Sequence, residues 1–381
     1  LSHSGQVFKS GEIYRLIRDE SPVGSENTIA VHIRHLREKL KALNLDGMIV
    51  SNPVSIKYLC NIEVDGLLLI TRKENIFLTY SMYLEMVKSI LTIADEVIVA
   101  DFRDIDKDEY ENFFLFCENI GFEENYVTYK DYHYLKQKYK VNNLAETENI
   151  IEKLRTVKDF EEIEKIEKAC EITDECYKHL LEFIKIGKTE KEIAFEIEMF
   201  FKNNGADGVA FDTVVAIGEN SANPHWKPSD RAVKMADLIL IDMGCKYQGY
   251  CSDMTRTIFM GCILEEIKPV YDLVLRNQLN VNKEIKEYAS IKTLSQMVES
   301  DFKLSKYNLI HSLGHGVGLE THEIPYINSK NDTFLKENMV IANEPGVYLP
   351  GKYGIRIEDT VLVEKNGCRI LTKSPKNYVV I

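Results

Sequence analysis

Residues 311–325 read HSLGHGVGLETHEIP, and this stretch places three histidines and three glycines close together. Glycines flank His315 on both sides, and we expect them to remove side-chain bulk where the backbone approaches an ion. His311 and His322 lie on either side, where each can donate or accept a proton. One isolated histidine is more often a packed core residue, but three in this arrangement favour a functional site.

Four carboxylates accompany His315 in the C-terminal part of the chain, each beside a strand-like apolar run or a glycine-rich turn: Asp242, Asp253, Glu344 and Glu358. Such groups cannot cluster bare in a folded interior, because like charges raise one another's pKa values until cations neutralise them. Two divalent ions roughly 3.5–4 Å apart would do this and activate a water. We therefore predict a two-metal hydrolase. Its oxygen-rich ligands favour Mn²⁺, with Co²⁺ or Zn²⁺ as alternatives.

Asp242 and Asp253 each lie at one end of a strand-like segment. Asp242 follows the apolar run 238–241, and Asp253 begins the β-prone run 253–259. The two runs are expected to pair as a hairpin in which the aspartates face each other. Taken alone, aspartates at the ends of a hairpin are more often part of the turn than metal ligands.

The two glutamates are expected to lie on strands. Alternation along a strand places Arg356 on the same face as Glu358, so the guanidinium could pair with a metal-bound carboxylate. The alternative for Arg356 is a surface ion pair. Glu323 and Asp359 alternate with the chosen residues and are expected to point away from them.

The composition restricts the class of protein. The 381 residues are 45% hydrophobic and 28% charged with a net charge of −13, which is typical of a soluble protein of two domains and argues against binding to nucleic acid. Apolar runs are far shorter than the roughly 18–20 residues that cross a bilayer, and no leader pattern is visible. Eight cysteines without a CxxC pair indicate free thiols, so we expect a cytoplasmic protein.

The domain organisation follows from the spacing of apolar residues. Residues 1–27 show little periodicity, and we interpret them as a loose arm or an expression remnant without a function. Short apolar runs alternate with helical stretches over 28–147, which predicts a small α/β domain. Residues 148–381 are assigned to the catalytic domain, beginning with a linking helix at 148–155. Within it, the capping pair of Thr189 and Glu192 predicts the start of a helix.

Five motifs together resemble those of the pita-bread metallopeptidases: Asp242-Met243-Gly244, the segment Tyr250 to Thr257, the segment Gly314 to Pro325, Asn343-Glu344-Pro345-Gly346, and Arg356-Ile357-Glu358-Asp359. Within this family the chain is most similar to the Xaa-Pro peptidases, namely proline dipeptidase (prolidase) and aminopeptidase P. The resemblance covers about residues 155–381, and the preceding domain resembles the creatinase-like domain of these enzymes. It implies an α/β (α+β) protein with a creatinase-like N-terminal domain and a pita-bread catalytic domain.

The resemblance also implies a role for each candidate ligand. Asp242 would bind one ion, Asp253 and Glu358 would bridge both, and His315 and Glu344 would complete the other. Glu344 would also accept and shuttle the proton.

For the remaining residues, the resemblance implies that His225 contacts the substrate and that His311 and His322 line the same cleft. His225 and His311 would orient the substrate, and His322 would stabilise the oxyanion-like intermediate. The implied substrates are short proline-containing peptides, and the implied assembly is a homodimer. Alternatives are an aminopeptidase P acting on longer peptides, another enzyme on this scaffold such as a creatinase-like amidinohydrolase or a general aminopeptidase, and a non-catalytic relative that binds peptides or partners.

Overall fold

The computed structural model describes residues 28–381 except 92–96, 105–109 and 111, and it divides into two compact units after Arg155. The predicted boundary after residue 147 lies too early. Ile150 and Ile151 of helix α7 (Ile150–Arg155) are buried in the apolar core of the first unit, so the predicted linking helix belongs to that unit. The segment 1–27, interpreted above as an arm or remnant, lies outside the described residues.

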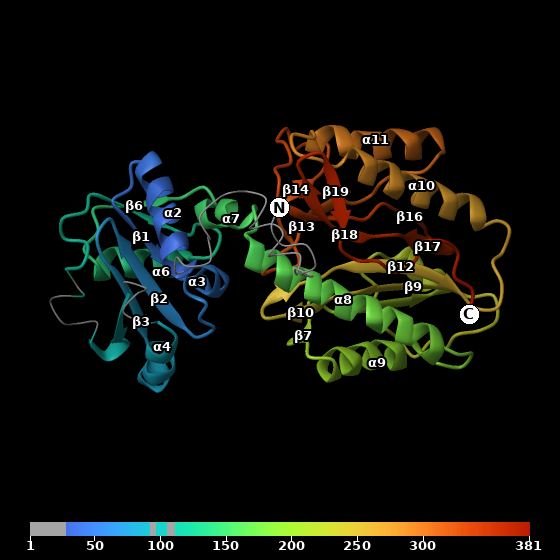
Figure 1. Ribbon diagram of the computed structural model, residues 1–381, viewed down its shortest axis with the longest axis horizontal. Helices are drawn as coiled ribbons and strands as arrows, with labels where there is room; N and C mark the ends of the chain where they lie inside the picture. Colours follow the sequence, from blue (N-terminus) through green and yellow to red (C-terminus); the bar gives the residue numbers. More distant parts are fainter. Residues whose placement is uncertain (1–27, 92–96, 105–109, 111) are drawn as a thin grey trace, which may run out of the picture. The chain divides into compact units, whose positions relative to one another are not determined.

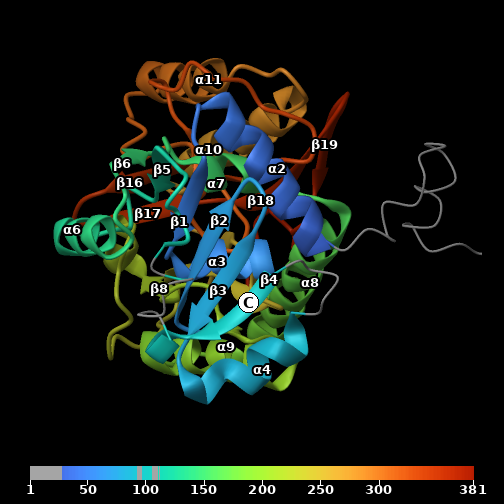
Figure 2. The same cartoon turned by 90° about the vertical axis from the view of Figure 1, so that its left-hand side faces the viewer.

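The first unit contains a six-stranded mixed sheet in the order β4-β3-β2-β1-β5-β6 (Figure 2). Its strands are β1 (Gly47–Val50), β2 (Gly66–Thr71), β3 (Asn75–Thr79), β4 (Val97–Asp101), β5 (Asn119–Phe122) and β6 (Asn143–Glu146). Strands β1, β2 and β3 pair antiparallel, whereas β4 joins β3, and β5 and β6 follow β1, in parallel.

Helices cover both faces of this sheet: α2 (Thr28–Ala42), α3 (Pro53–Cys60), α4 (Leu84–Ile90), α6 (Tyr129–Lys138) and α7, with 3₁₀ turns at Ser81–Tyr83 and Phe102–Asp104. Met48 of β1 packs in one apolar cluster with Leu36 of α2, while the next residue, Ile49, packs in another with Leu135 of α6. Alternation along β1 therefore buries both faces, which confirms the predicted α/β class for this unit.

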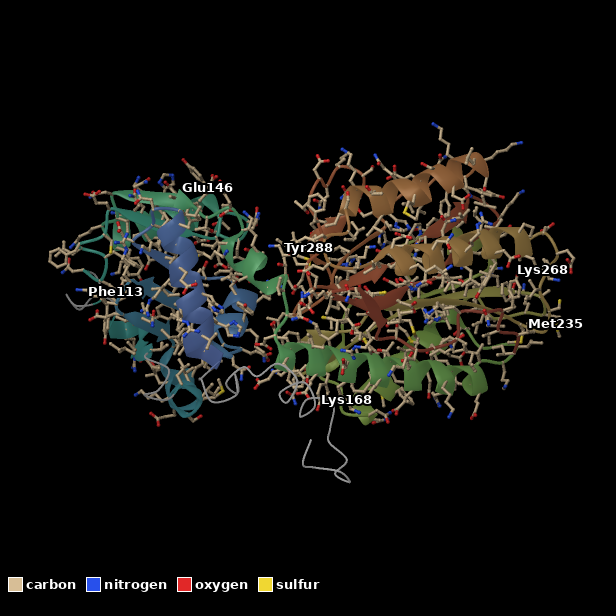
Figure 3. The ribbon with its side chains drawn as sticks, turned by 45° about the horizontal axis from the view of Figure 1, so that its top comes forward. Phe113, Glu146, Lys168, Met235, Lys268 and Tyr288 are labelled. Carbon is tan, nitrogen blue, oxygen red and sulfur yellow. The ribbon has the colours of Figure 1, made fainter. Side chains whose placement is uncertain are left out.

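Four helices of the second unit carry clear start signals or amphipathic faces: α8 (Phe160–Phe183), α9 (Glu190–Asn203), α10 (Lys268–Glu284) and α11 (Ile291–Leu304). Thr189 and Glu192 form the predicted reciprocal capping pair at the start of α9, and Asp159 and Glu162 form a second one before α8. Each pair satisfies backbone N–H groups that the first helical turn leaves unbonded. Lys168 projects from the outer side of α8 (Figure 3).

The strands of the second unit form several small sheets: β11-β10-β7, β12-β9-β8, β14-β13-β15-β18-β19 and the hairpin β16-β17. Their bounds are β7 (Gly208–Val209), β8 (Val214–Ile217), β9 (Leu238–Met243), β10 (Cys245–Tyr247), β11 (Tyr250–Cys251), β12 (Met254–Phe259), β13 (Gly314–Gly316), β14 (Glu323–Ile327), β15 (Val340–Asn343), β16 (Gly346–Leu349), β17 (Tyr353–Arg356), β18 (Asp359–Glu364) and β19 (Gly367–Ile370), with a 3₁₀ turn at Gly218–Ala222.

Strand β9 lies between two apolar layers. Leu238 and Leu240 pack in the cluster that includes residues of α10 and α11, whereas Ile239 and Ile241 pack with α8 and α9. Figure 1 shows these two helix pairs on opposite sides of the strands. Asp242 continues the first series, so alternation directs its carboxylate to the α10 and α11 side of the strand rather than toward α8. Among the residues that the structure describes, no helix has the length and apolar character needed to cross a membrane.

Candidate metal centre and substrate pocket

The predicted hairpin between the two aspartates exists, but its register differs from the prediction. Strands β9 and β12 pair antiparallel, and Asp242 lies opposite Thr255 rather than opposite Asp253. Asp253 precedes β12, so the two aspartates are diagonal neighbours. The reason is the connection, in which the short strands β10 and β11 fold back as a hairpin of their own. Both carboxylates nevertheless reach the same pocket.

Glu344 and Glu358 also lie just outside strands, which corrects the prediction that they ride on them. Glu344 follows β15, and its backbone N–H donates to the carbonyl oxygen of Leu313 (2.9 Å). Glu358 lies between β17 and β18, where its N–H donates to the carbonyl of Thr255 (3.1 Å) and its Oε2 accepts from the Thr255 hydroxyl (2.6 Å). These bonds fix both glutamates against neighbouring segments.

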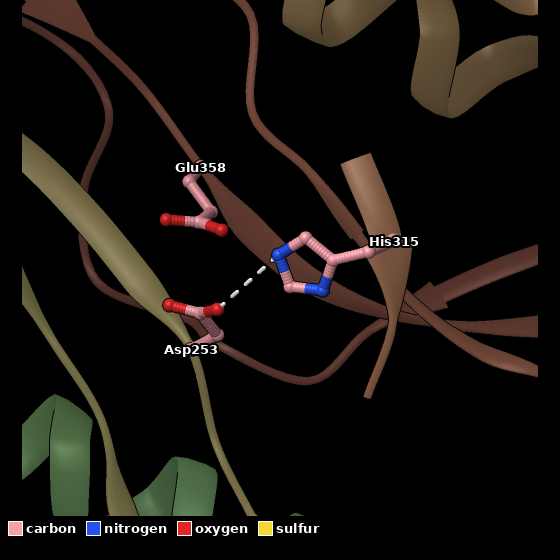
Figure 4. Close-up of side chains that lie close together, drawn as sticks. All are labelled: Asp253, His315 and Glu358. Carbon is pink, nitrogen blue, oxygen red and sulfur yellow. Dashed lines mark ion pairs between the residues drawn. The ribbon is translucent and has the colours of Figure 1, made fainter. Parts of the chain in front are cut away.

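His315 lies at the centre of this group, on strand β13. Its Nε2 is 3.3 Å from Glu344 Oε1 and 3.6 Å from Asp253 Oδ2. One ligand atom from each of Asp253, His315 and Glu358 lies within 4.8 Å of the others, and all three side chains are buried (Figure 4). The structure therefore brings together carboxylates and an imidazole in the way that a metal site requires.

The glycines beside His315 are required by the packing of the strands around them. A Cβ on Gly314 would lie 1.9 Å from the carbonyl oxygen of Ala342, and one on Gly316 would lie 2.5 Å from that of Ile324. The glycines are required because neighbouring strands approach the backbone closely on both sides of β13. The packing of strands is therefore sufficient to require glycine at both positions.

The charges of the group are not balanced by the protein alone. Burial, followed by repulsion from the other carboxylates, raises the pKa values of Asp253 and Glu358 well above their ordinary range. Burial also raises the pKa of Asp242, and its Oδ1 is buried without a hydrogen-bond partner. A bound cation would give this oxygen a partner and stabilise the ionised carboxylates, so the residues fit divalent metal ions.

Arg356 supplies part of the missing positive charge. Only 3% of the residue is exposed, and its guanidinium donates to Asp242 Oδ2 (2.7 Å), to the Tyr348 hydroxyl (2.7 Å) and to the Thr255 hydroxyl (2.9 Å). The alternative of a surface ion pair is therefore wrong. As predicted, Glu323 and Asp359 point elsewhere: they pair with Lys158 and with Arg256, respectively.

A cavity of about 620 Å³ opens over the group. All the predicted site residues line it: Asp242, Asp253, His315, Glu344, Glu358, His225, His311, His322 and Arg356. Sequence analysis did not single out the apolar residues Phe211, Pro224, Trp226 and Tyr326, which also line the cavity. The signal available in the sequence was the position of Trp226: this large, flat apolar residue directly follows His225, which was predicted to contact the substrate.

The histidines of the cavity differ in their surroundings. Burial lowers the pKa of His311, whose Nε2 lies 3.0 Å from the Tyr348 hydroxyl. Burial and then the nearby His315 lower the pKa of His322, and the rings of these two histidines are 4.2 Å apart between centroids. Both His311 and His322 are therefore neutral near pH 7, and each can donate one N–H and accept one proton.

Comparison with known proteins identifies the family. The model of metallopeptidase family M24 matches residues 164–365, and that of the creatinase/prolidase N-terminal domain matches residues 32–157. The chain belongs to metallopeptidase family M24. The resemblance inferred from the motifs is thus confirmed, together with the expected pairing of an M24 domain and a creatinase-like domain.

Individual M24 proteins are similar over most of the chain. A protein of Pyrococcus furiosus named Xaa-Pro dipeptidase is 36% identical over 90% of this chain and 100% of its own. The structure of an Xaa-Pro dipeptidase from Bacillus anthracis has a TM-score of 0.87 at 33% identity and covers 93% of this chain and 100% of that one. An X-Pro aminopeptidase from Thermotoga maritima has a TM-score of 0.81 at 33% identity, covering 90% and 100%. The pita-bread fold is therefore confirmed.

A third family model, the C-terminal domain of transcriptional regulatory proteins, matches residues 1–51 and overlaps the creatinase-like match. Of this segment the structure describes residues 28–51, which form α2 and β1. Leu36, Leu40 and Met48 from these elements are buried in the core of the first unit. In this chain, residues 28–51 are thus an integral part of the creatinase-like unit.

Proposed function

We propose that this protein hydrolyses the peptide bond between an N-terminal residue and proline in short peptides, acting as a proline dipeptidase. The observation that carries the proposal is one cavity in which five candidate metal ligands meet three histidines and a buried arginine. The names of the M24 relatives, Xaa-Pro dipeptidase and X-Pro aminopeptidase, support the choice of substrate.

In this proposal, Asp242, Asp253, His315, Glu344 and Glu358 would hold two divalent ions. When bound, the ions would lower the pKa of a water molecule and polarise the carbonyl of the scissile bond. Four carboxylates and one imidazole form a hard ligand set that suits Mn²⁺, and Co²⁺ or Zn²⁺ are the alternatives.

Glu344 is the proposed proton acceptor. Burial would raise its pKa, but the hydrogen bond and charge of His315 outweigh burial, so the pKa of Glu344 is lowered. The carboxylate is therefore ionised at neutral pH and can take a proton from the attacking water and pass it to the nitrogen of the leaving proline. Its backbone bond to Leu313 keeps it in place for both transfers.

The histidines act on the substrate in this proposal. His322 is exposed to the cavity and neutral, so its N–H can donate to the oxygen of the scissile carbonyl as negative charge develops there. His225 and His311 orient the peptide from the cavity wall. Arg356 holds Asp242 by its 2.7 Å bond and so fixes the direction of that carboxylate.

We favour a dipeptidase over an aminopeptidase P because two relatives that are 36% and 34% identical over 90% and 91% of this chain are both named Xaa-Pro dipeptidase. The test uses Mn²⁺-loaded protein and four compounds side by side: Ala-Pro, Ala-Pro-Pro, Met-Ala-Ser and creatine. Cleavage of Ala-Pro alone supports the proposal. Faster cleavage of Ala-Pro-Pro would instead indicate aminopeptidase P, and turnover of Met-Ala-Ser or creatine would indicate another enzyme of this scaffold.

The site assignment is tested with Asp253→Ala, which removes one of the candidate ligands. We expect Ala-Pro hydrolysis to fall below detection, with a lower metal content by elemental analysis. Asp332→Ala, at an exposed aspartate paired with Lys292, is the matched control and should keep full activity. Near-full turnover in Asp253→Ala would contradict the assignment. A wild-type protein that binds peptide but hydrolyses none would favour the non-catalytic alternative.

A cytoplasmic location and a homodimer complete the proposal. All eight cysteines are free, which suits a reducing compartment. The homodimer rests on the family resemblance and is tested by light scattering after size-exclusion chromatography, where a monomer would contradict it.

A further inference from the structure

Glu190 is a buried carboxylate that the reaction described above does not use. It is the first residue of α9, it is fully buried, and it does not line the cavity. Oε1 accepts from the Ile217 backbone N–H (2.7 Å) and from Asn220 Nδ2 (2.8 Å). Oε2 accepts from Trp226 Nε1 (2.9 Å) and from the backbone N–H (2.8 Å) and hydroxyl (2.6 Å) of Ser229. One side chain thus receives five hydrogen bonds.

Neutral groups stabilise this charge. Burial would raise the pKa of Glu190, but the hydrogen bonds from Ser229, Asn220, Trp226 and Ile217 outweigh it, so the pKa is lowered. The position of Glu190 in the first turn of α9 adds the favourable field of the helix N-terminus. Glu190 therefore stays ionised near neutral pH without a cation, and hydrogen bonds to a charged acceptor are stronger than bonds between neutral groups.

Four of the five donors belong to residues 218–229, and the fifth is the N–H of Ile217, directly before them. We call residues 218–229 the pocket loop; apart from the 3₁₀ turn at Gly218–Ala222 it has no regular secondary structure. Further bonds also hold the loop: the Ser221 hydroxyl accepts from the Gly354 N–H (2.7 Å), the Pro224 carbonyl from Arg356 Nη2 (3.5 Å), and the Ser229 carbonyl from the Lys191 N–H (3.2 Å). From Trp226 to Ser229, the Trp226 indole N–H and the Ser229 N–H and hydroxyl donate to Glu190, and the Ser229 hydroxyl also accepts from the Arg231 N–H (3.2 Å). This stretch immediately follows His225.

The same stretch forms one wall of the cavity. Pro224, His225, Trp226, Lys227 and Pro228 all line it. The bond to Glu190 fixes the indole N–H of Trp226 away from the solvent, while the ring also packs against the core beneath. The direction of this ring therefore depends on a carboxylate that touches neither the cavity nor the candidate ligands, and the ring directly follows His225, whose own N–H donates to Asn223 Oδ1 (3.1 Å).

We propose that Glu190 is a positioning residue that holds the pocket loop in the shape required to bind substrate. The inference rests on the proposed function, because it assumes that the cavity binds a peptide. It adds to that function a residue outside the cavity that affects substrate binding. A displacement of about 1 Å in residues that contact substrate can reduce a rate on the order of a hundredfold, so loss of this anchor should be visible in kinetics.

Glu190→Gln tests the proposal with almost no change in volume. The amide replaces one acceptor oxygen with an NH₂ group, which then faces N–H or O–H donors whichever way it is turned. At least two of the five bonds are therefore lost. We expect kcat/KM for Ala-Pro to fall by about tenfold or more, chiefly through KM, while the metal content stays that of the wild type.

The chain contains a single tryptophan, Trp226, so its fluorescence reports the pocket loop directly. In Glu190→Gln we expect emission shifted to longer wavelength and stronger quenching by iodide, because the indole loses its partner and becomes more exposed. This measurement uses metal-free protein without substrate. It therefore tests the loop even if the wild type proves inactive on Xaa-Pro peptides, an outcome that would count against the proposed function alone.

The matched control is Glu192→Gln in the same helix. Glu192 accepts hydrogen bonds from Thr189, not from the pocket loop, so this variant should keep wild-type emission and KM. If Glu190→Gln folds poorly, Ser229→Ala removes a single bond from the same carboxylate. It should produce a smaller change in the same direction, and Glu190→Asp should lie between the wild type and Glu190→Gln. Unchanged emission and kinetics in well-folded Glu190→Gln would overturn the proposal, as would equal effects of Glu192→Gln.

Discussion

Replacement of Arg356 by methionine tests whether the protein relies on cations to balance its acidic site. Methionine keeps much of the side-chain volume and removes the charge, so the loss is mainly electrostatic. Arg356 is buried and donates three hydrogen bonds of 2.7–2.9 Å, one of them to the carboxylate of Asp242. Without Arg356, Asp242 would keep no cationic side chain within ion-pair distance among the residues that the structure describes.

The expected magnitude follows from burial. Removal of one partner of a buried ion pair costs roughly 3–5 kcal/mol, because the other charge is left in a medium of low polarity. For a unit of this size each kcal/mol shifts the melting temperature by roughly 2–4 °C, so metal-free Arg356→Met should melt roughly 10 °C below the metal-free wild type. Divalent ions bind the folded state and stabilise it, by about 2.7 kcal/mol at a hundredfold excess over Kd. Loss of a positive charge beside the ligands should also strengthen cation binding.

The assay is thermal unfolding of both proteins in chelator and in excess Mn²⁺. The gap in melting temperature should be largest in chelator and should shrink to half or less with Mn²⁺. Lys158→Met is the control, since Lys158 is also a buried cation of the same unit but pairs with Glu323 outside the group. The difference in melting temperature between Lys158→Met and the wild type should be the same in chelator and in Mn²⁺. An Arg356→Met gap that Mn²⁺ leaves unchanged would refute the reasoning, because Arg356 would then stabilise the protein independently of the acidic group.

Two further predictions concern buried charges away from the cavity. Glu123 is buried in the first unit, and burial raises its pKa from 4.5 to about 7. Below pH 4.5 the Glu123 carboxyl is protonated in both the folded and the unfolded protein, and between pH 4.5 and about 7 only the unfolded protein releases the proton. The free energy of unfolding therefore falls by about 3 kcal/mol as the pH rises through this window, at about 1.4 kcal/mol per pH unit. Glu123→Gln should remove this decline. Hydrogen exchange of β1 and β5 measures it, because Trp226 lies in the other unit and its fluorescence does not report on the first. An identical decline in the variant would contradict the prediction. For the buried Lys158–Glu323 pair (3.2 Å), Lys158→Met and Glu323→Gln should each cost roughly 3–5 kcal/mol in urea unfolding, and the double variant less than their sum. Strictly additive losses would show that the two charges do not interact.

The sequence predicted those features that depend on local signals. The capping pair of Thr189 and Glu192 marks the start of α9, and the two β-prone runs around Asp242 and Asp253 pair as a hairpin. Each signal lies within a few residues of the element that it specifies. The glycines near His315 also follow a local pattern, but the strand packing that requires them was not predicted, because the strands that approach them are distant in sequence.

Features set by long-range packing were not predictable in this way. The register that places Asp242 opposite Thr255 depends on two short strands inserted in the connection. Arg356 pairs with a residue 114 positions earlier rather than with its strand neighbour. The partners of Glu190 follow it by 27 to 39 residues and lie in or beside an irregular loop, so no periodic pattern in the sequence indicates them. The boundary between the units lies after Arg155 rather than after residue 147, because two isoleucines of α7 are buried in a core formed by much earlier residues.

Glu190 and the group around Asp253 represent two ways to bury negative charge, and they differ in what they require from solution. Five neutral donors stabilise Glu190, and its lowered pKa keeps it ionised near neutral pH whether or not metal is bound. Asp253 and Glu358 have raised pKa values and face other carboxylates, so they reach a stable ionised state only with added positive charge. The wall of the cavity should therefore be formed before metal binds, whereas the acidic group should depend on it. In the proposed function, the surface that binds the peptide would then persist while the ions exchange.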